Sequence, residues 1–308
     1  MRILVLGVGA VGGYFGGRLA QKGVDVTFLV REKRRQQLEA SGLVIKSVHG
    51  DATITPQLLV SGDPSEPFDL IMLSTKAYHL EEAMASALPY IGDKTLILPL
   101  LNGVAHMEQL VSRYGTQRVL GGLCFIESTL NEAGEVVQTS KRHEVTFGEW
   151  QGENSSRLAL MAELFSNANA TFTLSKDIVP EMWHKYLFIT TLSGITTLMN
   201  SCVGPIRDAI YGKDLTLQLA EESVAVIRAL GAPIAENIVE KQMSIFWKQP
   251  DTTKSSMLRD MEKGLSVEAD HLQGYLLEAA KRLGVSTPLL QIAYTNLKVY
   301  ENKRLALS

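Results

Sequence analysis

The first thirty-one residues constrain the fold of this 308-residue chain more than any other stretch. Residues 3–6 are apolar and predict a short buried strand, and residues 10–22 show the spacing of a helix. A second apolar run follows at residues 24–30. Between the first run and the helix lie three glycines at G-x-G-x-x-G spacing: Gly7, Gly9 and Gly12. A strand, a glycine turn, a helix and a strand in this order form the first half of a dinucleotide-binding unit.

Each glycine of this turn has its own physical reason. Gly7 allows a tight turn out of the strand, Gly9 lets a pyrophosphate approach the backbone, and Gly12 lets the helix pack close to the sheet. The pyrophosphate would bind N–H groups at the positive end of the helix dipole. The alternative is a glycine-rich turn without a ligand, but its place between strand and helix favours the dinucleotide. The turn residues predicted to bind the cofactor are Gly7, Val8, Gly9, Ala10, Val11 and Gly12.

The end of the second apolar run indicates which dinucleotide binds. An NAD site usually has Asp or Glu here, which accepts a hydrogen bond from the ribose 2′-hydroxyl. This chain has Arg31 instead, and a guanidinium can bind a 2′-phosphate through two parallel hydrogen bonds. The sequence therefore favours NADP over NAD. Two alternatives stay open. Glu32 could accept the hydrogen bond from the ribose of NAD, and the basic residues 33–35 could simply be the solvated start of a helix.

Composition excludes several classes of function. The net charge of −3 gives no bulk attraction to nucleic acid or to an anionic membrane. The two cysteines, Cys124 and Cys202, form neither a disulfide framework nor a metal-ligand spacing, which fits a reducing cytoplasm. The glycines interrupt the apolar N-terminus, which is therefore not a signal peptide, and no stretch is apolar enough to span a bilayer. We expect a cytoplasmic protein that binds no nucleic acid, membrane or metal.

The pattern of the chain changes near residue 177. Before it, apolar runs such as residues 68–74 and 95–99 alternate with helical patterns, and after it helical patterns dominate. This order predicts an α/β fold, with a Rossmann-type dinucleotide-binding domain over residues 1–177 and a mostly α-helical domain over residues 178–308.

Shorter features of the first part are also predicted. Residues 43–47 and 52–59 alternate like strands and form a hairpin across Gly50, and residues 136–139 and 144–148 are predicted as two separate strands.

Two polar residues directly follow predicted parallel strands. Lys76 comes after the run at residues 68–74, and Asn102 comes after the run at residues 95–99. In an open parallel sheet, ligands bind beyond the carboxyl ends of the strands. We therefore expect both side chains to point towards the cofactor.

Lys185 is the strongest candidate for acid–base chemistry. It stands early in a helical pattern beside Trp183, Tyr186 and Phe188. Apolar neighbours would remove water from the ammonium group, lower its pKa and make it a better proton donor. The local residues alone favour the alternative, a surface lysine whose methylene stem lies along a core helix.

Other polar groups in the helical part permit two interpretations each. Hydroxyls at residues 252–256 precede a helical pattern, where they could bind an anion or simply cap the helix. Glu268 could orient the lysine or the cofactor, or favour a helix dipole from the first turn. His184 and His271 could act as acids or bases, although isolated histidines are more often ordinary helix residues.

Six motifs together give a specific resemblance over nearly the whole chain. The chain resembles the ketopantoate reductases, the 2-dehydropantoate 2-reductases of pantothenate synthesis. The motifs are Gly7-x-Gly9-Ala10-x-Gly12-Gly13, Ser74-Thr75-Lys76-Ala77, Leu101-Asn102-Gly103, Lys185, Ser255-Ser256-Met257 with Asp260, and Glu268-x-Asp270-x-x-x-Gly274.

The resemblance implies a reaction and a set of roles. NADPH would deliver a hydride to the keto carbon of ketopantoate, and Lys185 would stabilise the oxygen and supply its proton. Glu268 would meet the cofactor or position the lysine, as the second catalytic residue. Arg31 would hold the 2′-phosphate, and Lys76 and Asn102 would contact NADP(H). The implied substrate-binding positions are Asn102, Lys185, Ile189, Ser193 and Ser256.

The chain departs from the family at three positions. Ile189 and Ser193 share a helix face with Lys185 but replace asparagines of the family, and Gln273 replaces a third. An apolar Ile189 favours a 2-oxo acid without a terminal hydroxyl, because a buried hydroxyl without a partner is penalised. The alternative substrate is therefore another branched or aromatic 2-oxo acid.

Two further possibilities concern the class of protein and its oligomeric state. A non-catalytic NADP-binding sensor would not need Lys185 and Glu268 together, so their joint presence argues against it. Residues 283–300 offer an apolar face for a homodimer, although packing within one copy explains the face equally well.

Overall fold

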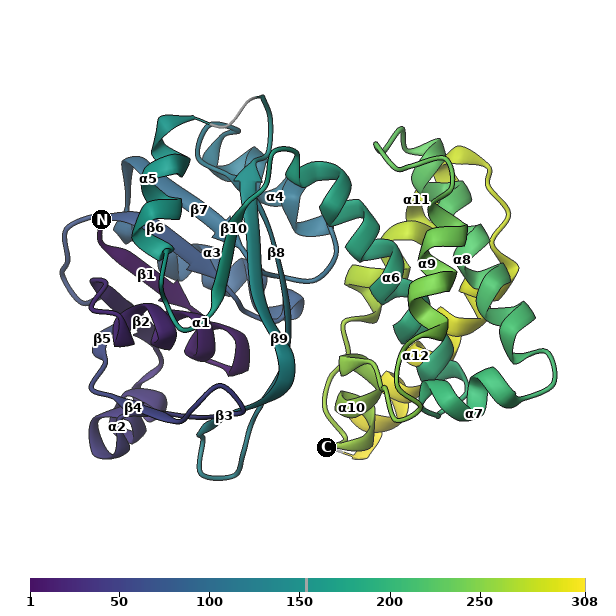
Figure 1. Cartoon of the computed structure of the whole chain (residues 1–308), viewed down its shortest axis with the longest axis horizontal. Coiled ribbons are helices and arrows are strands. Elements are labelled where there is room, and N and C mark those ends of the chain that lie inside the picture. Colours follow the sequence, from purple (N-terminus) through teal and green to yellow (C-terminus); the bar gives the residue numbers. More distant parts are fainter. Residues whose placement is uncertain (153–154, 308) are drawn as a thin grey trace. The chain divides into compact units, whose positions relative to one another are not determined.

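A computed structural model describes residues 1–152 and 155–307, and the chain divides into two compact units (Figure 1). Unit 1 comprises Met1–Leu101 and His106–Ile178, whereas unit 2 comprises Asn102–Ala105 and Val179–Ser308. The short segment Asn102–Ala105 therefore groups with the helical part of the chain, although it follows a strand of the first part.

The first sheet of unit 1 is parallel and has the strand order β5-β2-β1-β6-β7. Its strands are β1 (Ile3–Leu6), β2 (Val26–Val30), β5 (Gln57–Val60), β6 (Phe68–Leu73) and β7 (Ile91–Pro99). The central strands are almost continuously buried, as expected for parallel strands covered on both faces. Helix α1 (Ala10–Gln21) connects β1 to β2, as the glycine turn predicts.

The second sheet of unit 1 has the order β10-β9-β3-β4, and β8 pairs with β9. Its strands are β3 (Leu43–Ser47), β4 (Ala52–Ile54), β8 (Leu120–Leu130), β9 (Val136–Glu149) and β10 (Thr171–Leu174). The hairpin across Gly50 is confirmed, since β3 and β4 pair antiparallel and Gly50 has a φ of +97°.

Two strand predictions were wrong in this sheet and at its border. Residues 52–59 belong to two strands in different sheets, β4 and β5, because Pro56 interrupts the run and has no N–H to donate. The two strands predicted at 136–139 and 144–148 are the single strand β9, because β8 pairs along both parts with a register shift between Ile126 and Ser128.

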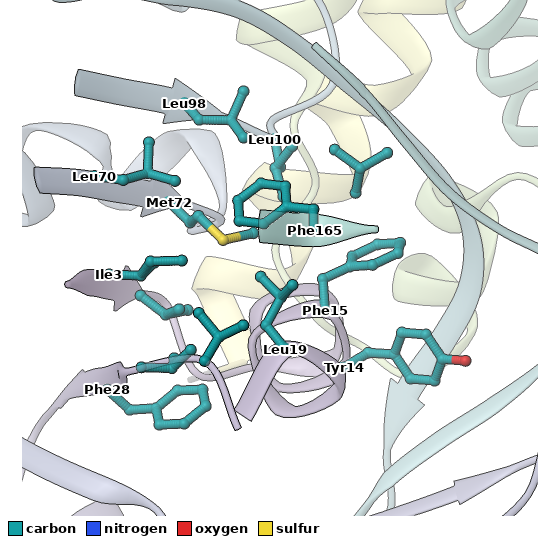
Figure 2. Packing of buried hydrophobic residues seen from close by; sticks show 14 of the residues in the cluster. Ile3, Tyr14, Phe15, Leu19, Phe28, Leu70, Met72, Leu98, Leu100 and Phe165 are labelled. Carbon is teal, nitrogen blue, oxygen red and sulfur yellow. The ribbon is translucent and has the colours of Figure 1, made fainter. Parts of the chain in front are cut away.

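Helix α1 packs between the two sheets, because small residues line more than one of its faces. A methyl group on Gly16 would lie 2.8 Å from Phe28 of β2, and one on Gly17 would lie 2.8 Å from Ile45 of β3. Figure 2 shows the larger side chains of this core, among them Phe15 and Leu19 of α1 with Met72 of β6. These two glycines therefore allow helix α1 to approach both sheets closely.

The remaining helices complete the predicted α/β fold with its mostly helical C-terminal part, which is confirmed. Unit 1 adds α2 (Glu32–Ser41), α3 (Leu80–Ala87) and α5 (Ser156–Phe165), and α4 (Ala105–Tyr114) begins at the end of the Asn102–Ala105 segment. The helices of the second part are α6 (Ile178–Leu198), α7 (Val203–Asp208), α8 (Gly212–Ala229), α9 (Ile238–Trp247), α10 (Ser256–Glu262), α11 (Tyr275–Leu283) and α12 (Pro288–Leu307). A short π-helical segment, Asp270–Gly274, precedes α11 and is called the π turn below.

Helix α6 lies inside unit 2 and is buried along most of its length. Some of its hydroxyl side chains bond back to the helix, as Thr196 Oγ1 does to Leu192 O and Thr197 Oγ1 to Ser193 O, each at 2.6 Å. Polar residues can therefore be buried here without distant partners. Within the described residues, no helix combines the length and the apolarity needed to cross a bilayer.

The buried Glu222 of α8 caps the N-terminus of α12. Its carboxylate accepts hydrogen bonds from the backbone N–H groups of Leu289 and Leu290, at 3.2 and 2.9 Å. We expect Glu222→Ala to lower the free energy of unfolding by about 2–3 kcal/mol, because it leaves two buried donors unpaired. Urea denaturation measures the change. The neighbouring Glu221→Ala is the control, since Glu221 is exposed; equal losses in both variants would contradict the capping role.

Candidate active site

The three glycines of the turn differ in the space around them. Gly7 has a φ of +86°, and a methyl group there would lie 2.8 Å from the backbone of Ser74 and Thr75. A methyl group on Gly12 would lie 2.5 Å from the carbonyl oxygen of Gly7. Gly9 precedes α1 and differs from both, because a methyl group there would meet no atom within 4 Å. Packing therefore requires Gly7 and Gly12, whereas Gly9 faces open space.

Ser74 holds this turn in place. Its hydroxyl donates to the carbonyl oxygens of Leu6 and Gly7, at 2.9 and 3.0 Å. The next hydroxyl along the chain, that of Thr75, is buried without a hydrogen-bond partner among the described residues. An unsatisfied hydroxyl beside an open glycine turn fits a polar ligand such as a dinucleotide. The sequence reasoning quoted Ser74 only within a motif, although a hydroxyl directly after a buried parallel strand was the available signal.

The other turn residues line the same start of α1. Val8 is buried, and Ala10 and Val11, the first residues of the helix, are half-buried. Lys76 is also half-buried and immediately precedes a short 3₁₀ turn, Ala77–His79.

Arg31 stands at the end of β2, directly before α2, as the sequence predicts. Its guanidinium pairs with Glu82 at 2.6 Å, and both side chains are exposed. Exposed pairs contribute little stability, so a phosphate group can replace this partner. Glu32 is the first residue of α2 and accepts a hydrogen bond from Gln36 at 3.2 Å.

Lys185 and Asn102 are brought together within unit 2. Lys185 is only 8% exposed, so the interpretation as a surface lysine is wrong. Its Nζ donates to Oδ1 of Asn102 at 3.0 Å, across a separation of 83 residues. A buried ammonium thus lies at a fixed distance from a neutral amide oxygen. A lysine ammonium has N–H donors and no acceptor, so the asparagine oxygen is a suitable partner for it.

The π turn contacts the same asparagine. Nε2 of His271 lies 2.8 Å from the backbone carbonyl oxygen of Asn102. Burial lowers the pKa of His271, and the nearby charge of Glu268 opposes this shift only in part. Glu268 itself is half-buried, three residues before the histidine. The sequence reasoning treated His271 as an ordinary helix residue and missed this contact.

His184, by contrast, has a structural role. Its Nε2 accepts from the backbone N–H of Ala235 at 3.4 Å, and burial lowers its pKa, which keeps it a neutral acceptor.

The positions that depart from the family differ in their surroundings. Ile189 is half-buried, whereas Ser193 is 2% exposed and Gln273 is fully buried. Nε2 of Gln273 donates to Ser193 Oγ at 2.7 Å. The serine hydroxyl is therefore engaged inside the helical packing. Its glutamine partner keeps an unpaired Oε1, in the described part of the chain.

Ser256 is exposed at the first turn of α10. The preceding residue, Ser255, is the N-cap of this helix and accepts from the N–H of Leu258 at 3.0 Å. The capping interpretation of these hydroxyls is therefore confirmed for Ser255. Among residues 1–152 and 155–307, no group of three or more histidine, cysteine, aspartate or glutamate side chains could hold a metal ion.

Comparisons with known proteins cover both parts of the chain. Residues 3–152 match the family model of ketopantoate reductase PanE/ApbA, and residues 177–301 match the model of its C-terminal part. The chain is 43% identical over 304 residues to the uncharacterized oxidoreductase YkpB of Bacillus subtilis, covering 99% of this chain and 100% of the relative.

Relatives named for an activity are more distant. The 2-dehydropantoate 2-reductase of Pyrococcus horikoshii is 26% identical, with 98% of each chain covered. Among solved structures, the PanE/ApbA family ketopantoate reductase from Ralstonia eutropha has a TM-score of 0.88 at 25% identity, covering 99% of this chain and 100% of the other. Sequence and fold thus point to the same group of proteins.

Proposed function

We propose, since this chain belongs to the ketopantoate reductase family, that it reduces ketopantoate to pantoate with NADPH. The chain is an NADP-dependent oxidoreductase that interconverts a 2-oxo acid and a 2-hydroxy acid. The proposal adds the identity of the substrate and a place in pantothenate biosynthesis. It also adds a cytoplasmic location, where the free thiols of Cys124 and Cys202 would stay reduced.

The proposed residue roles are those that the family resemblance implies. The cofactor, when bound, supplies the hydride. The turn Gly7–Gly12 holds its pyrophosphate, Arg31 its 2′-phosphate, and Lys76 and Asn102 contact it further. Lys185 directs an N–H group to the keto oxygen, stabilises the charge that develops there and then donates the proton. Glu268 completes the proposed catalytic pair, and Ser256 binds substrate.

One observation carries the proposal, the bond between the buried ammonium of Lys185 and the amide oxygen of Asn102. Asn102 is a neutral acceptor, so it orients the ammonium without taking its proton. An ammonium directed in this way can donate to the keto oxygen or the carboxylate of a 2-oxo acid when the substrate binds. This geometry suits an acid that acts on a 2-oxo acid.

The test is a steady-state assay of NADPH oxidation with ketopantoate, repeated with NADH. Fast turnover that prefers NADPH supports the proposed substrate and cofactor. NADPH binding without turnover of any 2-oxo acid would contradict the proposed reaction. Binding of NADPH and NADH with equal affinity would contradict the role of Arg31.

A second candidate substrate is a 2-oxo acid with an apolar side chain. Ile189 is half-buried one helical turn after Lys185, where it offers a methyl surface and no hydrogen bond. Trimethylpyruvate is the sharpest probe, because it is ketopantoate without the hydroxyl group. If trimethylpyruvate has the higher kcat/KM, the second candidate replaces the first.

Ile189→Asn tests the same position directly. We expect it to raise the ratio of kcat/KM for ketopantoate over trimethylpyruvate about 10- to 100-fold, because an amide can pair with the hydroxyl. Ile189→Leu is the matched control, since it stays apolar and should leave the ratio unchanged. A ratio that is the same in all three proteins would remove Ile189 as a determinant of specificity.

Assembly is the last part of the proposal. Within α12, Ile292 and Val299 are 56% and 45% exposed, so the apolar face predicted for a homodimer is partly uncovered in one copy. Sedimentation of the purified protein would show whether two copies associate.

A further inference from the structure

We infer that His271 is a positioning residue, which holds the backbone of Asn102 so that the side chain of Asn102 holds Lys185. This inference rests on the proposed function of Lys185. It concerns a residue that none of the family motifs quoted above includes. All the contacts involved lie inside unit 2.

The first step is the direction of the hydrogen bond. A backbone carbonyl oxygen can only accept, so Nε2 of His271 carries the hydrogen and donates to Asn102 at 2.8 Å. Burial lowers the pKa of His271, which keeps the imidazole neutral at neutral pH. The histidine therefore fixes the asparagine without adding a second positive charge beside the ammonium of Lys185.

The second step is the fit between the two segments. Gly103 has a φ of +82°, and a methyl group there would lie 3.1 Å from Leu272 and 3.4 Å from His271. The backbone after Asn102 thus lies directly on the π turn. A side chain at residue 103 would adopt a strained positive φ and press against the π turn.

The third step is the attachment of the π turn to α6. The Tyr186 hydroxyl donates to the carbonyl oxygen of Leu272 at 2.5 Å, and burial raises the pKa of Tyr186 well above its usual value. Gln273 bonds to Ser193 on the same helix. Both neighbours of His271 on its C-terminal side are therefore fixed to the helix that carries Lys185.

These contacts close a ring. Lys185 bonds to the side chain of Asn102, whose backbone bonds to His271, and the next residue, Leu272, bonds to Tyr186 beside Lys185. A ring of this kind fixes the lysine more narrowly than one hydrogen bond can, because each member limits the movement of the next. Segments with π geometry occur often at functional sites, which agrees with this role.

The test compares two variants of the histidine. His271→Leu removes the donor, and we expect kcat to fall about 10- to 100-fold, because the proton donor is misplaced. His271→Gln keeps an N–H donor of similar reach and should recover most of this loss. His184→Leu is the control, because His184 has a structural role on α6 and its loss should lower Tm without lowering kcat.

A second measurement does not depend on turnover. Acetic anhydride modifies free amines, and mass spectrometry reports the rate at Lys185. We expect about a fivefold faster reaction in His271→Leu and in Asn102→Ala than in the wild type, because a hydrogen bond that restrains the amine is lost. His271→Gln should react at nearly the wild-type rate.

These outcomes separate the inference from the proposed function. An inactive wild type with ketopantoate and other 2-oxo acids would overturn the proposed function, and the modification rates would still test the inference. The inference would be overturned if His271→Leu kept both the kcat of the wild type and its modification rate at Lys185. An equal loss of kcat in the Leu and Gln variants at equal Tm would also overturn it, because the donated hydrogen bond would then not matter.

Discussion

Lys185→Ala is expected to bind NADPH as the wild type does and to lose turnover by roughly three orders of magnitude. A positioned general acid contributes about 10²- to 10⁴-fold, and the loss of a charge that stabilises the developing oxyanion adds to this. The buried position of Lys185 strengthens the expectation, because water cannot easily take over the place of an ammonium that is only 8% exposed.

The measurement is kcat for 2-oxo acid reduction, together with the Kd for NADPH from fluorescence titration. Lys241→Ala is the matched control, because Lys241 is an exposed helix lysine of the same unit. Methylamine added to Lys185→Ala should restore part of the lost rate, since it supplies an ammonium of the right size. A variant that keeps kcat within tenfold of the wild type would contradict the assigned role.

The glycine turn was predictable because its physics is local. The conformation of Gly7 and the packing of Gly12 depend on residues of one short motif and on the strands beside it. The same holds for the hairpin across Gly50. Local chain geometry limits what can occupy such positions, so the sequence alone carries most of the information.

The contacts around Lys185 were less predictable, because they join distant segments through backbone atoms. The His271 contact spans 169 residues and ends on the carbonyl oxygen of Asn102, which any residue type would present. The pattern of side chains in the sequence therefore does not predict this contact. The π turn that carries the histidine also departs from the ordinary helical spacing on which the sequence reasoning relied.

Helical spacing also gave an incomplete account of α6. Lys185, Ile189 and Ser193 do share one face, but spacing does not indicate which part of that face other helices cover. The structure buries Ser193 against Gln273 and leaves Ile189 half-buried. A substrate-binding role for the isoleucine therefore agrees better with the structure than one for the serine, whose hydroxyl already has a partner.

Gly9→Ala is expected to keep the fold and to weaken NADPH binding about 100-fold, or ~2.7 kcal/mol. Gly9 has an extended backbone with a negative φ of −91°, outside the left-handed region that disfavours alanine, and the added methyl group meets no protein atom within 4 Å. The methyl group would instead occupy the space through which a pyrophosphate approaches the backbone. The free energy of unfolding should change by less than about 0.5 kcal/mol.

Gly12→Ala is the contrasting variant, because it should lose stability as well as affinity. Its methyl group would overlap Ser74 Oγ and lie 2.5 Å from the carbonyl oxygen of Gly7, so α1 must move away from the sheet. Overpacking of this kind costs about 1–3 kcal/mol. Titration with NADPH measures the affinity of both variants, and urea denaturation measures their free energy of unfolding. Together they distinguish a glycine that leaves room for the ligand from one that leaves room for packing. If Gly9→Ala bound NADPH as tightly as the wild type, the open side of the turn would not be the pyrophosphate site, whatever the effect at Gly12.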